Sequence, residues 1–92
     1  MKRIYKYPFP IQVESDFVIH MPVGAKILTV QLQNGDPYIW AIVDPAAEIC
    51  ARSFLLFGTG NPLPTDITAL PYIGTFQLRS GSFVFHLFEG IA

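Results

Sequence analysis

Cysteine, histidine and carboxylate side chains are the residues of this sequence best suited to chemistry, and they are few and scattered. There are one cysteine, Cys50, two histidines, His20 and His86, and seven carboxylates. Each histidine lies inside an apolar run without a cysteine or carboxylate at metal-ligand spacing, whereas a structural zinc site needs four ligands, usually in close pairs. We therefore predict no metal site. The alternative role for the histidines is a hydrogen bond to a strand neighbour such as Thr75.

The same residues do not indicate catalysis. Cys50 and a histidine would make a nucleophile–base pair only if the fold brought them together, and nothing in the sequence does so. The carboxylates lie mostly at turns, where they cap or solvate chain reversals. Since no set of nucleophile, base and orienting group is visible, we predict that the protein is not an enzyme and uses no cofactor.

The segment GTGNP at residues 58–62 offers successive backbone N–H groups, which can cradle an anion such as a phosphate. It lacks the GK[ST] ending of a nucleotide-binding loop, and Pro62 and Pro64 prevent a following helix. The alternative is a tight turn in which the two glycines supply positive φ. The candidate binding residues in this segment are Gly58, Thr59, Gly60 and Asn61.

A β-hairpin over Ala25–Asp44 must position most of the remaining candidates, because two apolar runs flank Asn34-Gly35. A two-residue turn there sets Gln33 opposite Asp36 and fixes the later pairs. The pairs predicted for an aliphatic core face are Leu32–Pro37, Val30–Ile39, Leu28–Ala41 and Lys26–Val43, and those for a mixed face are Gln31–Tyr38, Thr29–Trp40 and Ile27–Ile42. Tyr38 and Trp40 are candidate binding residues on the mixed face, and the alternative is that a second layer of the same chain covers them.

A second hairpin is predicted from Tyr72–Arg79 and Ser82–Glu89 around Ser80-Gly81. Its predicted core pairs are Leu78–Phe83, Phe76–Phe85 and Gly74–Leu87, and its mixed-face pairs are Gln77–Val84, Thr75–His86 and Ile73–Phe88. Further strands are expected over Arg3–Tyr7, Phe17–Met21 and Ile49–Phe57, with turns at Gln12–Asp16 and Thr65–Leu70. We therefore predict one all-β domain over residues 1–92. It should be a small antiparallel sandwich or flattened barrel of about seven short strands, with at most one or two helical turns near residues 45–49.

The composition points to a surface that something else covers. Hydrophobic residues make up 51% of the chain and charged residues only 14%, against about 25% charged in typical domains. A small domain of this kind leaves apolar patches exposed, and such patches usually mark interaction surfaces. We therefore predict self-association or an obligate partner, with an aromatic-rich monomer as the alternative.

Charge and hydrophobicity also exclude some partners. The net charge of −1 gives no basic surface for nucleic acid. No run approaches the roughly 20 apolar residues of a membrane span, and no signal peptide is visible, so we predict a cytoplasmic protein. Lys2, Arg3 and Lys6 with Tyr5 and Tyr7 would either bind an anion beside a ring or form a solvated edge strand.

Short motifs typical of one family are spread along almost the whole chain. They are Ile4–Pro8, Met21-Pro22, Gly24–Leu28, Val30-Gln31, Gln33–Gly35, Trp40-Ala41, Val43–Pro45, Gly58–Gly60, Pro62, Tyr72–Gln77 and Val84–His86. In these motifs the chain resembles a family of short uncharacterised proteins found in bacteriophages, prophages and bacteria. The resemblance implies a phage setting inside a host cell and brings no assigned activity or catalytic residues.

These observations predict a small non-enzymatic binding protein that works as a homo-oligomer. Its partner would be a host or phage protein, or a small host signal bound at a subunit interface by Tyr38, Trp40 and the segment 58–61. The alternative is a structural accessory subunit of a virion or another assembly, which would dock through the mixed face of the first hairpin.

Overall fold

A computed structural model describes residues 1–11, 15–64 and 66–91, and for Ser15 it describes the backbone alone. The described residues form seven strands and a single 3-10 turn, which confirms the all-β prediction. The elements are β1 (Arg3–Pro8), β2 (Ser15–Pro22), β3 (Lys26–Gln33), β4 (Asp36–Val43), β5 (Ile49–Gly58), η1 (Ile67–Ala69), β6 (Tyr72–Leu78) and β7 (Phe83–Glu89).

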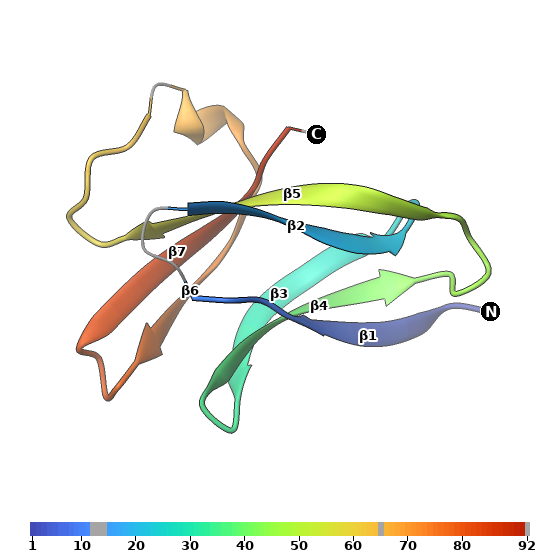
Figure 1. Cartoon of the computed structure of the whole chain (residues 1–92), viewed down its shortest axis with the longest axis horizontal. Helices are drawn as coiled ribbons and strands as arrows, with labels where there is room; N and C mark the ends of the chain where they lie inside the picture. Colours follow the sequence, from blue (N-terminus) through green and yellow to red (C-terminus); the bar gives the residue numbers. More distant parts are fainter. Residues whose placement is uncertain (12–14, 65, 92) are drawn as a thin grey trace.

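The strands form two antiparallel sheets, with the order β1-β4-β3 in one and β2-β5-β7-β6 in the other (Figure 1). We call them sheet A and sheet B. The sheets form an open sandwich and do not close into a barrel. At one side β6 passes close to β3, where a Cβ atom on Gly74 would lie only 2.9 Å from Cγ1 of Val30. Glycine is therefore required at position 74 by the approach of the two edge strands.

One apolar core lies between the sheets. Strand alternation turns every second side chain of each sheet inward, so both sheets contribute to the same cluster. Its fully buried members include Ile39 and Ala41 from sheet A and Phe54, Leu56 and Leu87 from sheet B. The remaining members are Phe9, Met21, Ala25, Val30, Val43, Phe76 and Phe85.

The register predicted for the first hairpin is confirmed from the turn as far as Thr29–Trp40, and it is wrong from the predicted pair Leu28–Ala41 onward. A bulge between Ile27 and Thr29 sets Ile27 opposite Ala41 and Lys26 opposite Ile42. The extra residue turns Leu28 outward, where it is 42% exposed, and lets Ile27 pack against the core instead. Leu32, also predicted to be core, lies near the end of the strand and is 38% exposed.

The second hairpin keeps its predicted register from Leu78–Phe83 to Gly74–Leu87. A bulge then sets Tyr72 opposite Phe88, so the predicted pair Ile73–Phe88 is wrong, and Ile73 turns toward the core. Phe83, placed in the predicted core, is 45% exposed because it lies at the open end beside the turn.

One connection agrees with prediction and one differs from it. No helix forms near residues 45–49, which lies within the predicted limit of at most one or two helical turns. The side-chain oxygen of Asp44 accepts a hydrogen bond from the backbone N–H of Ala46, and the backbone carbonyl of Asp44 accepts one from the N–H of Ala47. These two bonds make a tight turn that leads directly into β5. The turn predicted over Gln12–Asp16 is wrong for Ser15 and Asp16, which begin β2, and its first three residues lie outside the described residues.

The strand β1 confirms the prediction for Arg3–Tyr7 and lies at an edge of sheet A. Tyr7 faces inward, opposite Ile39, and packs against the core. Burial of the Tyr7 side chain raises its pKa above the ordinary value of 10.0, and the neighbouring Tyr5 adds to the increase.

This pKa shift predicts a loss of stability in alkali. Because folded Tyr7 holds its proton to a higher pH than unfolded Tyr7, the stability is fully present below pH 10.0 and falls as the pH rises above it. Urea titrations between pH 8 and 11 should therefore show a shallower decline for Tyr7→Phe than for the native chain. Tyr5→Phe is the control, and an equal effect of both variants would contradict the prediction.

Candidate functional site

A cleft with an aromatic lining lies on the outer face of sheet B. Alternation places Phe57, His86 and Thr75 in one row across β5, β7 and β6, pointing away from the core. The chain that follows β5 runs beside this row, and together they enclose a cleft of about 310 Å³. Figure 1 shows this long connection, in yellow and orange, standing away from sheet A. The cleft therefore opens on the side opposite to the shared core.

Hydroxyl groups hold the His86 ring at both of its nitrogen atoms. Its Nδ1 lies 2.9 Å from Oγ1 of Thr75, and its Nε2 lies 2.6 Å from Oγ1 of Thr59. Tyr72 extends the chain, since its hydroxyl is hydrogen-bonded to Oγ1 of Thr75. The hydroxyl of Thr59 also reaches the carbonyl of Val84 at 3.4 Å, so it can serve either tautomer of the ring. The predicted hydrogen bond between His86 and Thr75 is confirmed.

Aromatic rings form the apolar wall of this cleft. Phe57 and Phe88 meet edge to face with ring centroids 6.1 Å apart, and Tyr72 lies 5.3 Å from Phe88. Phe57 is 7% exposed, although it points to the outer face, whereas Tyr72 at the rim is 57% exposed. The cleft thus combines a fixed hydrogen-bonding edge with an accessible ring face, which suits a planar ligand.

The segment predicted from its glycines forms the rim of the cleft. Thr59 donates its amide to the carbonyl of Val84, and Asn61 donates its amide to the carbonyl of Gly58. Gly60 has a φ of 87°, as the tight-turn prediction requires, but Gly58 belongs to β5 and does not have positive φ. A Cβ atom at position 58 would lie 2.8 Å from Nδ2 of Asn61, so a larger residue there would displace the Asn61 side chain.

The other predicted residues, Tyr38 and Trp40, lie on the outer face of sheet A. The Nζ of Lys6 lies 4.7 Å from the ring centroid of Tyr38 and 5.8 Å from that of Trp40, so these rings hold the cation, not Tyr5 or Tyr7. Among the described residues, the buried Nε1 of Trp40 has no hydrogen-bond partner. Within one chain, the two groups of predicted binding residues therefore belong to different sheets.

The remaining chemical candidates are separated. His20 is exposed on β2, on the outer face of sheet B, while Cys50 is half-buried on the inner face of β5, opposite Met21. The described residues contain no group of three or more histidine, cysteine or carboxylate side chains that would hold a metal ion. Among the described residues that line the cleft at His86 there is no carboxylate, and both ring nitrogens of His86 are hydrogen-bonded to hydroxyl groups of the protein.

Sequence reasoning missed the aromatic half of the cleft. Phe57, Tyr72 and Phe88 were assigned to strands but not to a site. A signal was present, because the predicted register placed Thr75 opposite His86 on the mixed face and so marked this face as partly polar. What the sequence did not show was that the connection after β5 folds beside that face.

Comparisons with known proteins place the chain in a family. Among the described residues, no helix has the length and apolar character needed to span a bilayer. No curated protein matches the chain, and no solved structure does so. A family model described as "Domain of unknown function (DUF7352)" matches residues 1–92. Because this match covers the whole length, the protein belongs to the DUF7352 family.

Proposed function

We propose that the protein is a non-enzymatic binding domain that takes a small planar ligand in the cleft beside His86. The observation that carries this proposal is the joint presence of a fixed polar edge and an aromatic wall in one cleft of about 310 Å³. That volume lies at the lower end of the usual range for small-molecule sites, roughly 300–1,000 Å³. The cleft therefore suits a ligand of one or two rings.

The lining of the cleft also suggests the charge and shape of the ligand. Among the described residues, no lysine, arginine or carboxylate lines the cleft, so these residues offer no ion pair to a charged group. The exposed ring of Tyr72 offers a stacking surface, and the side chains of Thr59 and Asn61 stand at the rim. Neutral heteroaromatic compounds such as nucleobases and nucleosides fit both features, because they stack and hydrogen-bond through one edge.

The proposed setting is a bacterial cytoplasm that contains phage or prophage genes. This part of the proposal rests on the motif resemblance described above. In such a setting the ligand would be a small signal of the host cell, and the protein would act by sequestering it. No bond is made or broken in this function, in agreement with a histidine that is held by hydroxyl groups alone.

A thermal-shift screen with nucleobases and nucleosides tests the proposal. We expect at least one compound to raise the melting temperature of the native chain by binding the folded state. Tyr72→Ala should weaken that binding, measured by calorimetry, about tenfold, because one stacked ring contributes roughly 1–3 kcal/mol.

The control for this prediction is Tyr5→Ala, which removes a tyrosine that is 40% exposed on sheet A, away from the cleft. Its affinity for the compound should equal that of the native chain. A panel without any stabilising compound, or a compound that binds Tyr72→Ala as tightly as the native chain, would contradict the proposal.

A further inference from the structure

The edge formed by β2 has few of the features that usually keep sheet edges from pairing, because its proline, Pro22, is the last residue of the strand and Asp16 is its one carboxylate. Of the four edge strands, β1 carries Arg3 and Lys6, while β3 and β6 are each interrupted by a bulge and lie against one another. In contrast, β2 pairs with β5 over all eight residues without a register shift, and it contains no lysine or arginine. An unbroken edge of this kind is a template for another strand.

The sequence of β2 is complementary to itself in one register. When two copies of a strand pair antiparallel about a twofold axis, one residue must lie opposite its own copy at the axis. The axis cannot fall between neighbouring residues, because opposed side chains lie on the same face of the sheet and neighbouring side chains do not. With the axis at Val18, Asp16 lies opposite His20 of the second copy, and Phe17 lies opposite Ile19. Moving the axis to Phe17 or Ile19 removes the pairing of the carboxylate with the imidazole.

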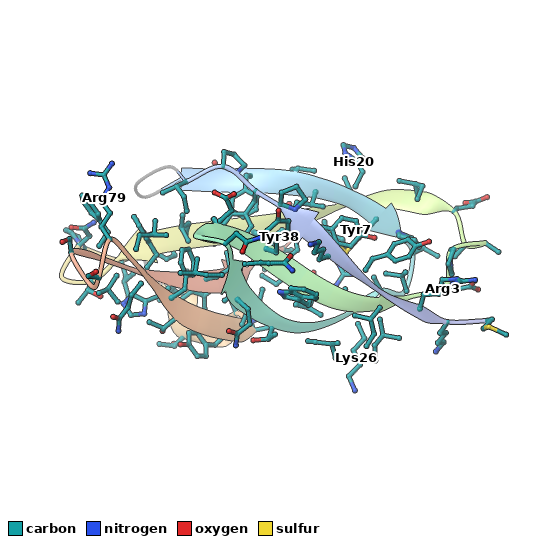
Figure 2. The ribbon with its side chains drawn as sticks, turned by 90° about the horizontal axis from the view of Figure 1, so that it is seen from below. Arg3, Tyr7, His20, Lys26, Tyr38 and Arg79 are labelled. Carbon is teal, nitrogen blue, oxygen red and sulfur yellow. The ribbon has the colours of Figure 1, made fainter. Side chains whose placement is uncertain are left out.

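The exposure of these side chains agrees with that register. Val18, which would meet its own copy at the axis, is 52% exposed on the outer face of sheet B. His20 is on the same face, and Figure 2 shows it pointing away from the body of the molecule, on the side opposite to Lys26. Phe17 and Ile19 face inward and are half-buried against the core, so a second copy would extend the core laterally.

We infer that two copies of this chain associate through β2, with the twofold axis at Val18, to give one continuous eight-stranded sheet. The strand order across the interface would be β7-β5-β2 followed by β2-β5-β7 of the second copy. Backbone hydrogen bonds supply the affinity, and the opposed pairs Phe17–Ile19 and Asp16–His20 fix the register. The inference deepens the self-association expected from the composition, and it does not depend on any ligand in the cleft.

Solution mass as a function of concentration tests this inference. Light scattering coupled to gel filtration should give twice the chain mass of 10.3 kDa at high concentration and a lower average on dilution. Val18→Lys places two like charges opposite each other at the axis and should leave a monomer at every concentration. Val23→Lys is the matched control, because Val23 is 55% exposed but lies beyond the end of β2, and this variant should associate as the native chain does.

A charge exchange tests the register separately. His20→Glu places a carboxylate opposite Asp16 of the second copy, at two symmetry-related positions of the interface. This like-charge pairing should raise the dissociation constant of the dimer about tenfold. Adding Asp16→Lys restores two opposite-charge pairs and should recover the native dissociation constant. Circular dichroism confirms that each variant is folded. A native chain that stays monomeric, an association that survives Val18→Lys, or a double variant that is no tighter than His20→Glu would overturn the inference, and none of these results bears on the ligand screen.

Discussion

Replacing Phe54 with alanine should lower the free energy of unfolding by about 3–5 kcal/mol, the usual cost of truncating a buried phenylalanine. Phe54 is fully buried, and it lies in β5 between β2 and β7, opposite Phe17 and Glu89. Its ring stacks on that of Phe17 with centroids 5.6 Å apart. The two sheets are held at the spacing of large side chains, so the cavity left by alanine would collapse only in part.

This loss is a large fraction of the total free energy of unfolding. A domain of this length has a total stability of about 5–14 kcal/mol, and each kcal/mol corresponds to roughly 4–8 °C in melting temperature. Urea denaturation measures the change directly. Phe83→Ala is the matched control, since Phe83 is 45% exposed on β7, and it should cost about 1 kcal/mol or less. Equal losses in the two variants would show that Phe54 is not at the centre of the core.

The second large effect is expected for Arg52→Met. The Nε and Nη2 atoms of Arg52 donate to the two carboxylate oxygens of Glu89 at 2.6 and 3.1 Å, and its Nη1 atom donates to the carbonyl of Ala25 at 2.9 Å. Arg52 therefore joins β5 to β7 and to the turn that enters sheet A. Both charged side chains are 20% exposed. Removing the cation leaves a carboxylate and a carbonyl without a donor, so we expect a loss of about 2–3 kcal/mol.

The pH dependence of this loss follows from the pKa of Arg52. The hydrogen bond to Glu89 raises that pKa above its ordinary value, although burial acts in the opposite direction. A base with a raised pKa contributes fully at every pH below its unfolded pKa, so the loss should be constant between about pH 6 and 9. Arg79→Met, which removes an exposed arginine from a turn, should cost about 0.5 kcal/mol. A double-mutant cycle with Glu89→Gln would contradict the prediction if it showed no coupling.

The strand pairing was predictable where the turn chemistry is local. Asn34 and Gly35 both adopt positive φ, 53° and 83°, which is the geometry that Asn-Gly favours in a two-residue hairpin, and the register next to this turn is as predicted. The errors begin at the bulges near Leu28 and Ile73. A bulge depends on how one sheet fits the other, for example where β6 crosses β3 at Gly74, and that fit is not visible in the alternation of a single strand.

The candidate site was predictable to a similar extent and for a similar reason. The segment Gly58–Asn61 and the hydrogen bond between Thr75 and His86 follow from turn residues and from register, both of which are short-range. The position of Tyr72 beside Phe88 depends on the bulge, and the position of the rim depends on a long connection without regular strands. Long-range packing decides both positions. The sequence therefore predicts the polar side of the cleft and does not predict its aromatic side.

The strand order has a consequence for synthesis of the protein. The strands β1 and β2 are made well before their partners β4 and β5, which follow much later in the chain. At translation rates of roughly 5–20 residues per second, β1 and β2 remain without their partner strands for a time on the order of seconds. Lys2, Arg3 and Lys6 keep β1 hydrated during this interval. The segment around Phe17–Met21 has no such protection, so newly made chains on neighbouring ribosomes would meet there first, and protein yield should respond to translation speed and chaperone supply.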